Sequence, residues 1–304
     1  MTTLLSFTLY PHFLASSAIH RCRQPPTTTA TLKKPTTSEN VRFLCSPYQR
    51  VSRFVVPCRV SAIAQDLVYN AGATVGVLGG AYALVFAFDD LTKREILHQS
   101  LSRKLVHILS GLLFLVSWPI FSNSNEARYF AAFVPLVNCL RLLVNGLSLV
   151  SDEGLVKSVT REGDPRELLR GPLYHVMILM LCALVFWRES PIGVISLAMM
   201  CGGDGVADII GRRYGSIKIP YNRKKSWAGS ISMLVIGFLV SLGMLYYYSI
   251  LGHVQLEWLS TVPRVAFVAF VATVVESLPI TEIVDDNISV PLVTMALASF
   301  IFKH

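Results

Sequence analysis

The sequence predicts an all-α fold, a polytopic membrane helix bundle that follows a disordered transit peptide. Composition is the first reason, because 53% of the 304 residues are hydrophobic and only 15% are charged, whereas soluble domains carry about a quarter charged residues. The second reason is a series of apolar runs of membrane-crossing length. The third is an N-terminal segment whose composition differs from that of the remaining chain.

Residues 1–62 have the composition of an organellar transit peptide. The segment is rich in Ser, Thr and Pro, as in the tract PPTTTATLKKPTTS, and residues 1–65 hold eight Lys or Arg against one acidic residue. It lacks the uninterrupted apolar core of a secretory signal, and its Ser and Thr content favours a plastid destination. We therefore expect a chloroplast transit peptide over 1–62 and an integral membrane domain over 63–304. A disordered cytosolic tail is the alternative.

The net charge of +8 does not indicate a nucleic-acid partner, because most of the excess lies in this leader. The remaining chain has 19 basic and 18 acidic residues. No segment indicates a protein partner either. The six cysteines form no CxxC pair or Cys/His metal pattern, so we expect them to be reduced, small apolar residues.

Apolar runs alternate with short polar loops from Leu67 onward. Some of the runs are short for a span of about 20 residues, so we predict seven or eight membrane crossings. The candidate spans are 67–88, 105–121, 128–150, 172–187, 191–211, 229–251, 263–280 and 287–302.

The charges of the loops support this count. With eight spans, the loops 89–104, 151–171, 212–228 and 276–287 share one side and contain fourteen Lys or Arg, against four on the other side. Such an asymmetry is the positive-inside bias of membrane proteins. We expect the basic face to lie toward the stroma or cytosol, in a chloroplast membrane that is either the envelope or the thylakoid.

The fifth run contains two acidic residues, Asp204 and Asp208, in the stretch CGGDGVADIIGR. Four residues apart, they share one face of a helix, and Arg212 follows one turn later. Each acid costs about 2.5–3.5 kcal/mol at the middle of a membrane helix, whereas an apolar side chain returns about 0.3–0.6 kcal/mol. We expect the pair to face a polar cavity, a cation or basic partners. A purely structural Asp–Arg pair is the simpler alternative.

The loop after this run, RRYGSIKIPYNRKKSWAGS, carries six cations. Carboxylates followed by clustered cations suit a metal–polyphosphate, with Asp204 and Asp208 as Mg²⁺ ligands and the cations on phosphate oxygens. An ordinary positive-inside loop is the alternative. The chain has no GxxxxGK[ST] or GxGxxG motif, so any nucleotide is bound by other means. The candidate phosphate-binding residues are Lys218, Lys224, Lys225, Ser226, Gly229 and Arg212.

Further polar residues are predicted on the same side of the membrane. Glu276 interrupts the seventh run, and His107 lies in SRKLVHILSG, where it is either functional or an interfacial residue. The acidic turn TEIVDDN contains Glu282, Asp285, Asp286 and Asn287. These residues suit a second set of metal ligands or a base, and the alternative is an ordinary solvated turn. The candidate catalytic residues are Asp208, Glu276, Asp286 and His107.

The third run carries a polar stripe formed by Asn138, Arg141 and Asn145. An arginine within a membrane needs a carboxylate or phosphate partner. The remaining candidates converge on one face of the membrane, which suggests an interfacial active site open to an aqueous nucleotide and to a lipid between helices.

At these residues the sequence resembles the polyprenol kinase family, the dolichol-kinase-like and CDP-diacylglycerol-synthase-like membrane enzymes. The similarity covers roughly residues 65–302 and is strongest to the plant chloroplast branch. It rests on three motifs, GGDGVADIIGRRYGSIKIPYNRKKSWAGS (202–230), SRKLVHILSG (102–111) and VESLPITEIVDDNISVP (275–291).

The resemblance implies a lipid kinase that phosphorylates the prenyl alcohol phytol to phytyl phosphate with CTP or UTP. That product feeds phytyl diphosphate for tocopherol biosynthesis and recycles phytol from chlorophyll. In this hypothesis Asp204 and Asp208 hold Mg²⁺, and the loop lysines bind phosphates. Glu276, Asp286 or His107 positions or deprotonates the alcohol.

Three other functions fit the same residues. A farnesol or geranylgeraniol kinase would carry nearly the same motifs. A cytidylyltransferase that makes a CDP-lipid would use the same metal and phosphate ligands. A multi-pass transporter would use the intramembrane acids and Arg141 to line a path, although no inverted repeat is visible.

Overall fold

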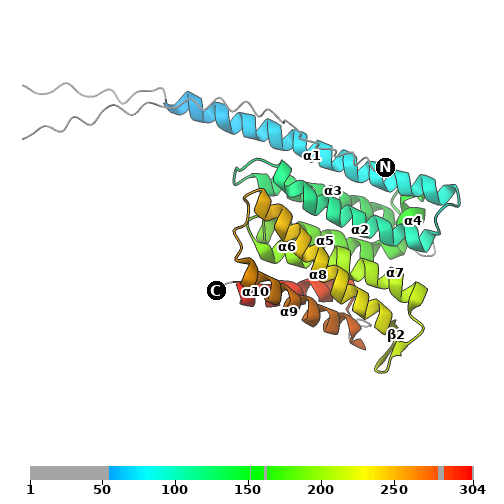
Figure 1. The fold of residues 1–304 in the computed structure, drawn as a ribbon. Helices are drawn as coiled ribbons and strands as arrows, with labels where there is room; N and C mark the ends of the chain where they lie inside the picture. Colours follow the sequence, from blue (N-terminus) through cyan, green and yellow to red (C-terminus); the bar gives the residue numbers. More distant parts are fainter. Residues whose placement is uncertain (1–54, 151, 161–162, 280–283, 303–304) are drawn as a thin grey trace, which may run out of the picture. The chain divides into compact units, whose positions relative to one another are not determined.

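The computed structural model describes residues 55–150, 152–160, 163–279 and 284–302. These residues form a helical bundle (Figure 1), which confirms the predicted fold class. By length and composition, seven helical segments of the described chain suit a membrane crossing, and the C-terminal helix is apolar but shorter. The transit peptide predicted for 1–62 falls outside the described residues, except for 55–62 at the start of α1.

The helices follow the predicted apolar runs closely. The first part of the chain forms α1 (Val55–Lys93), α2 (Gln99–Ser117), η1 (Trp118–Ile120), α3 (Ala127–Gly146), α4 (Glu153–Val159), η2 (Pro165–Leu169) and α5 (Gly171–Val185). The second part forms α6 (Pro191–Leu197), η3 (Ala198–Asp204), α7 (Gly205–Tyr214), β1 (Lys218–Ile219), β2 (Asn222–Ser226), α8 (Trp227–Ile250), α9 (Trp258–Ser277) and α10 (Asp286–Phe302).

One continuous helical span, Pro191–Tyr214, forms the centre of the bundle. It comprises α6, η3 and α7. Of the residues in its most apolar stretch, 78% are buried inside the protein, against 11% for the corresponding stretch of α1. The middle segment η3 is a π-helix, a widened helical turn that occurs frequently at functional sites. The glycines Gly202 and Gly203 therefore do not break the helix. They allow close packing instead, since a Cβ on Gly203 would lie 3.3 Å from the Cα of Gly237 on α8.

The basic loop after α7 folds into a short antiparallel hairpin, which the all-α prediction did not include. Lys218 of β1 pairs with Ser226 of β2, and Ile219 pairs with Asn222. The hairpin is tied to the end of α9, because Asn222 donates to the carbonyl oxygen of Ser277 at 3.1 Å. The Tyr221 hydroxyl also lies 2.8 Å from the Ser277 hydroxyl. These contacts fix the residues of β2 against α9.

At the other end of the bundle, a buried arginine holds the turn between η1 and α3. Arg188 is 1% exposed, and its guanidinium donates to the carbonyl oxygens of Phe121 at 2.7 Å and Ser122 at 2.8 Å. It also donates to the side-chain oxygen of Asn123 at 2.6 Å. A charge so buried is stable only when its donors are satisfied. Arg188 is therefore a structural residue.

Candidate functional site

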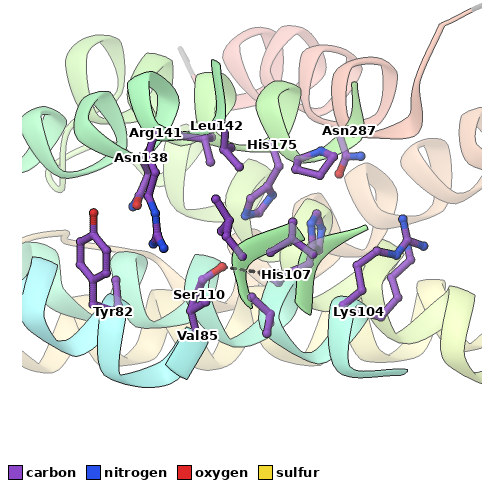
Figure 2. Close-up of a pocket in the computed structure, with 18 residues that line it drawn as sticks. Tyr82, Val85, Lys104, His107, Ser110, Asn138, Arg141, Leu142, His175 and Asn287 are labelled. Atoms are coloured by element: carbon purple, nitrogen blue, oxygen red, sulfur yellow. Dashed lines mark hydrogen bonds between the residues drawn. The ribbon is translucent and has the colours of Figure 1, made fainter. Parts of the chain in front are cut away.

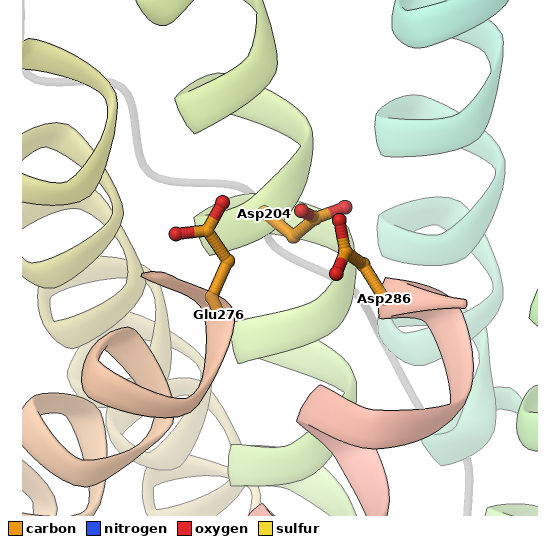
Figure 3. A group of neighbouring side chains, drawn as sticks. All are labelled: Asp204, Glu276 and Asp286. Carbon is orange, nitrogen blue, oxygen red and sulfur yellow. The ribbon is translucent and has the colours of Figure 1, made fainter. Parts of the chain in front are cut away.

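Three carboxylates from separate segments meet at one end of the bundle. Asp204 ends η3, Glu276 lies in the last turn of α9, and Asp286 begins α10. Each offers an oxygen within 4.8 Å of the others, and Figure 3 shows Asp204 between Glu276 and Asp286. Asp204 and Glu276 are each 4% exposed. We call these three residues the carboxylate cluster.

Lys225 of β2 neutralises part of this charge. Its ammonium contacts Glu276 and lies 2.8 Å from the Oδ2 of Asp286. Burial lowers the pKa of Lys225, but the charges of Glu276, Asp204 and Asp286 outweigh it, and the net pKa is raised above its ordinary value. Lys225 is therefore a permanent cation at the cluster.

Lys104 of α2 joins the cluster to Asp208. Its ammonium lies 3.8 Å from Asp204 and 3.4 Å from Asp208. Asp208 stands one turn beyond Asp204 and also accepts from Arg212 at 3.0 Å. The two acids thus share one cation, but only Asp204 belongs to the carboxylate cluster. The structure groups Asp204 with Glu276 and Asp286, whereas the sequence predicted a metal pair of Asp204 with Asp208.

The start of α8 is held against α7 beside this cluster. The Oγ of Ser226 caps α8 by accepting from the backbone N–H of Gly229 at 3.2 Å, which satisfies one of the open donors of a helix N-terminus. A Cβ on Gly229 would lie 3.1 Å from the carbonyl oxygen of Ala207. A larger residue would push the two helices apart at the cluster.

Two adjoining cavities surround these charges. The first has a volume of about 250 Å³ and the second about 420 Å³, and both are lined by Lys104, Asp204, Lys224, Lys225 and Asp286. A cavity of this kind, lined by both carboxylates and lysines, can hold a cation and the phosphates that it neutralises.

Most of the candidate residues line the smaller of these two cavities. They are Asp204, Asp208, Arg212, Lys224, Lys225, Ser226, Gly229, Glu276 and Asp286. Lys218 is exposed on β1 and lines neither cavity. His107 lies in a third cavity, against His175. Glu282 lies outside the described residues.

The polar stripe of α3 has the carboxylate partner that the sequence required. Arg141 lies 2.5 Å from Asp152, and Asn145 accepts from the backbone N–H of Asp152 at 2.9 Å. Burial raises the pKa of Asp152, but the hydrogen bond and charge of Arg141 and the backbone donors at the start of α4 outweigh it and hold the pKa below its ordinary value. Arg141 thus serves to fix α4 to α3.

Sequence reasoning did not assign Lys104, His175, Asn222 or Ser230 to the site. Lys104 was visible as a cation one turn before His107, and His175 as an ionisable residue in an apolar run, which is itself a functional signal in membranes. Ser230, whose hydroxyl lies 3.5 Å from Glu276, and Asn222 gave no signal. Their roles depend on contacts between segments far apart in the sequence.

The fold and the site together define a class, a polytopic membrane protein with a buried, charge-lined cavity suited to a cation and phosphates. No family model matches the chain, and no solved structure matches it.

Curated relatives do match. "Probable phytol kinase 1, chloroplastic" of Glycine max is 76% identical over 310 residues, which cover 99% of this chain and 100% of the relative. "Phytol kinase 1, chloroplastic" of Arabidopsis thaliana is 65% identical over 245 residues, 80% of this chain and 81% of that one. "Probable phytol kinase, chloroplastic" of Zea mays is 61% identical over 245 residues, again 80% and 81%. The chain therefore belongs to the phytol kinase family.

Proposed function

We propose that this protein is a phytol kinase of a chloroplast membrane, which transfers the γ-phosphoryl group of CTP or UTP to phytol. The carboxylate cluster beside Lys225 and Lys104 is the observation that supports the proposal most strongly. Phosphoryl transfer requires positioning and charge neutralisation more than covalent help, and this cavity offers both signs of charge. Membership of the phytol kinase family supports phytol as the acceptor.

The carboxylate cluster fits a divalent cation such as Mg²⁺. Carboxylate oxygens are the ligands that this ion prefers. The Oδ1 of Asp286 is buried and has no hydrogen-bond partner among the described residues, so it retains a lone pair for a ligand. Mg²⁺ held there would supply charge neutralisation for the β- and γ-phosphate oxygens.

The cations of the cavity divide into two roles. Lys225, Lys224 and Arg212 line the cavity on its hairpin and α7 side and bind phosphate oxygens. Lys104 lies between Asp204 and Asp208 and holds these acids in place. Asp208 keeps Arg212 oriented toward the phosphates and shares Lys104 with Asp204.

The reaction then proceeds by direct displacement. The phytol hydroxyl oxygen forms a bond to the γ-phosphorus while the bond from that phosphorus to the bridging oxygen breaks, and the nucleoside diphosphate leaves. The hydroxyl proton passes to one of the predicted acid–base residues, Asp208, Glu276, Asp286 or His107. The product, phytyl phosphate, would feed phytyl diphosphate for tocopherol biosynthesis.

The test is an assay with the purified chain in detergent, phytol, Mg²⁺ and CTP labelled either at the γ- or at the α-phosphate. The proposal predicts γ-label in the lipid product and no α-label. Transfer of α-label would instead identify a cytidylyltransferase. Absence of any labelled lipid would refute an enzymatic role, and a product formed in detergent excludes a role limited to transport. Parallel reactions with farnesol and geranylgeraniol, and with UTP, rank the substrates.

A further inference from the structure

An apolar cavity of about 120 Å³ lies between α1, α2, α3, α4 and α5, and none of the three residues of the carboxylate cluster lines it. Its walls include Val85 of α1, Val106 of α2 and Val176 of α5. Figure 2 shows Tyr82 facing Asn138 and Arg141 at one end, and Lys104 and Asn287 at the other. A smaller cavity of about 50 Å³ continues it, reaching Phe114 and Leu179.

These cavities adjoin one another in a row that starts at the charged site, and we call this row the path. The apolar cavity and the larger charged cavity share Arg103, Lys104, Pro172 and Asn287. The apolar cavity and the smaller one share Ala81, Ser110, Asn138 and Val176. The section of α2 from Lys104 to Phe114 is about 15 Å long at about 1.5 Å per residue, which is about half the thickness of a membrane's hydrocarbon core.

Two histidines occupy the head of this path. The rings of His107 and His175 lie 3.9 Å apart between centroids, and both residues line the apolar cavity. The Nε2 of His107 and both ring nitrogens of His175 are buried without a hydrogen-bond partner among the described residues. Buried polar atoms are normally paired, and each unpaired one needs an explanation. A ligand hydroxyl located here, between the charged cavity and the apolar cavity, would provide a hydrogen-bond partner for these nitrogens.

We propose that this path holds the prenyl alcohol, with its hydroxyl at His107 and His175 and its hydrocarbon chain directed past Ala81 toward Phe114. The assignment rests on the proposed function, because it places the acceptor oxygen on the side of the cavity that adjoins the carboxylate cluster. His175 is then a positioning residue for the hydroxyl. Ala81 and Val176 line both cavities, so they border the section that a long hydrocarbon chain passes and a short one does not reach.

The test compares Ala81→Phe with Ala83→Phe. Both substitutions add the same side chain to α1, but Ala81 lines both cavities whereas Ala83 is exposed. The measurement is equilibrium binding of radiolabelled phytol and of the shorter geraniol to the purified full chain in detergent. Excluding about two methylene groups from the path should weaken phytol binding about tenfold in Ala81→Phe. Geraniol binding, and phytol binding by Ala83→Phe, should change less than about twofold on the same basis.

Equal phytol binding by the two variants, or equal losses for phytol and geraniol in Ala81→Phe, would overturn the assignment. Phytol binding does not require phosphoryl transfer, so the two proposals can fail separately. If Ala81→Phe weakened phytol binding but the wild type formed no phosphorylated product, the kinase activity would be refuted and the binding path would be supported. His175→Phe separates hydroxyl positioning from packing. It should lower kcat/KM for phytol about tenfold, as for the loss of one hydrogen bond, with the KM for CTP unchanged. A wild-type profile would refute the role of His175.

Discussion

Lys225→Met removes the cation that contacts both Glu276 and Asp286 but keeps an unbranched apolar side chain of nearly the same length. At the 2.8 Å separation of the Lys225 ammonium and Asp286, Coulomb attraction is roughly 6 kcal/mol for an effective dielectric of about 20. Most of it is offset by desolvation, and hydrogen bonds to charged groups contribute about 1.5–3 kcal/mol net. A phosphate oxygen that accepts such a charged hydrogen bond from Lys225 would be stabilised by up to about 3 kcal/mol. Losing this stabilisation corresponds to about a hundredfold fall in kcat/KM for the nucleotide.

The variant also has an effect on the cation requirement. Without the Lys225 ammonium to neutralise them, the three carboxylates should bind Mg²⁺ more tightly. The Mg²⁺ concentration for half-maximal activity should therefore fall. Initial rates measured against CTP and Mg²⁺ give both quantities. Lys218→Met is the matched control, because Lys218 belongs to the same hairpin but is exposed outside both charged cavities. If Lys225→Met and Lys218→Met behaved alike, the placement of Lys225 in the phosphate site would be wrong.

Asp204→Asn preserves the shape of the side chain but removes a charge from the carboxylate cluster, and it should lower kcat about 100- to 1,000-fold. The control is Asp90→Asn, because Asp90 is paired with Arg94 outside the charged cavities. The kcat of this control should stay near the wild-type value in the same assay. Asp208→Asn should abolish activity without loss of membrane insertion, since it frees Lys104 and Arg212, and near-normal turnover would contradict its role. Arg188→Met leaves the carbonyls of Phe121 and Ser122 unpaired and should destabilise the fold by about 3 kcal/mol. Thermal unfolding in detergent checks this change against Arg264→Met, because Arg264 is only partly buried and lies over the Phe302 ring. Equal midpoints for the two variants would contradict the prediction.

The fold was largely predictable because membrane crossing imposes a strong constraint on composition. A helix that spans a membrane needs about 20 mainly apolar residues, and charged loops separate such runs. The predicted span 229–251 thus corresponds to α8, Trp227–Ile250. The hairpin was less predictable, since Asn222 and Lys225 are held by α9 rather than by local propensity.

The partners within the site could be predicted only in part. Helical spacing placed Asp204 and Asp208 on one face, and Lys104 indeed lies near both. Helical spacing could not show that Asp204, at the end of the π-helical segment, meets Glu276 of α9 and Asp286 of α10. Such a cluster depends on the packing of helices far apart in the chain, which spacing along one helix does not encode.

The most direct test of the proposed active site is whether the carboxylate cluster binds the cation that accompanies the nucleotide. Electron paramagnetic resonance of Mn²⁺, a substitute for Mg²⁺, measures this on the purified chain in the presence of CTP, independently of turnover. Cation binding by the carboxylate cluster predicts a protein-bound Mn²⁺ signal in the wild type and in Asp90→Asn that is lost in Asp204→Asn. An unchanged signal in Asp204→Asn would contradict it.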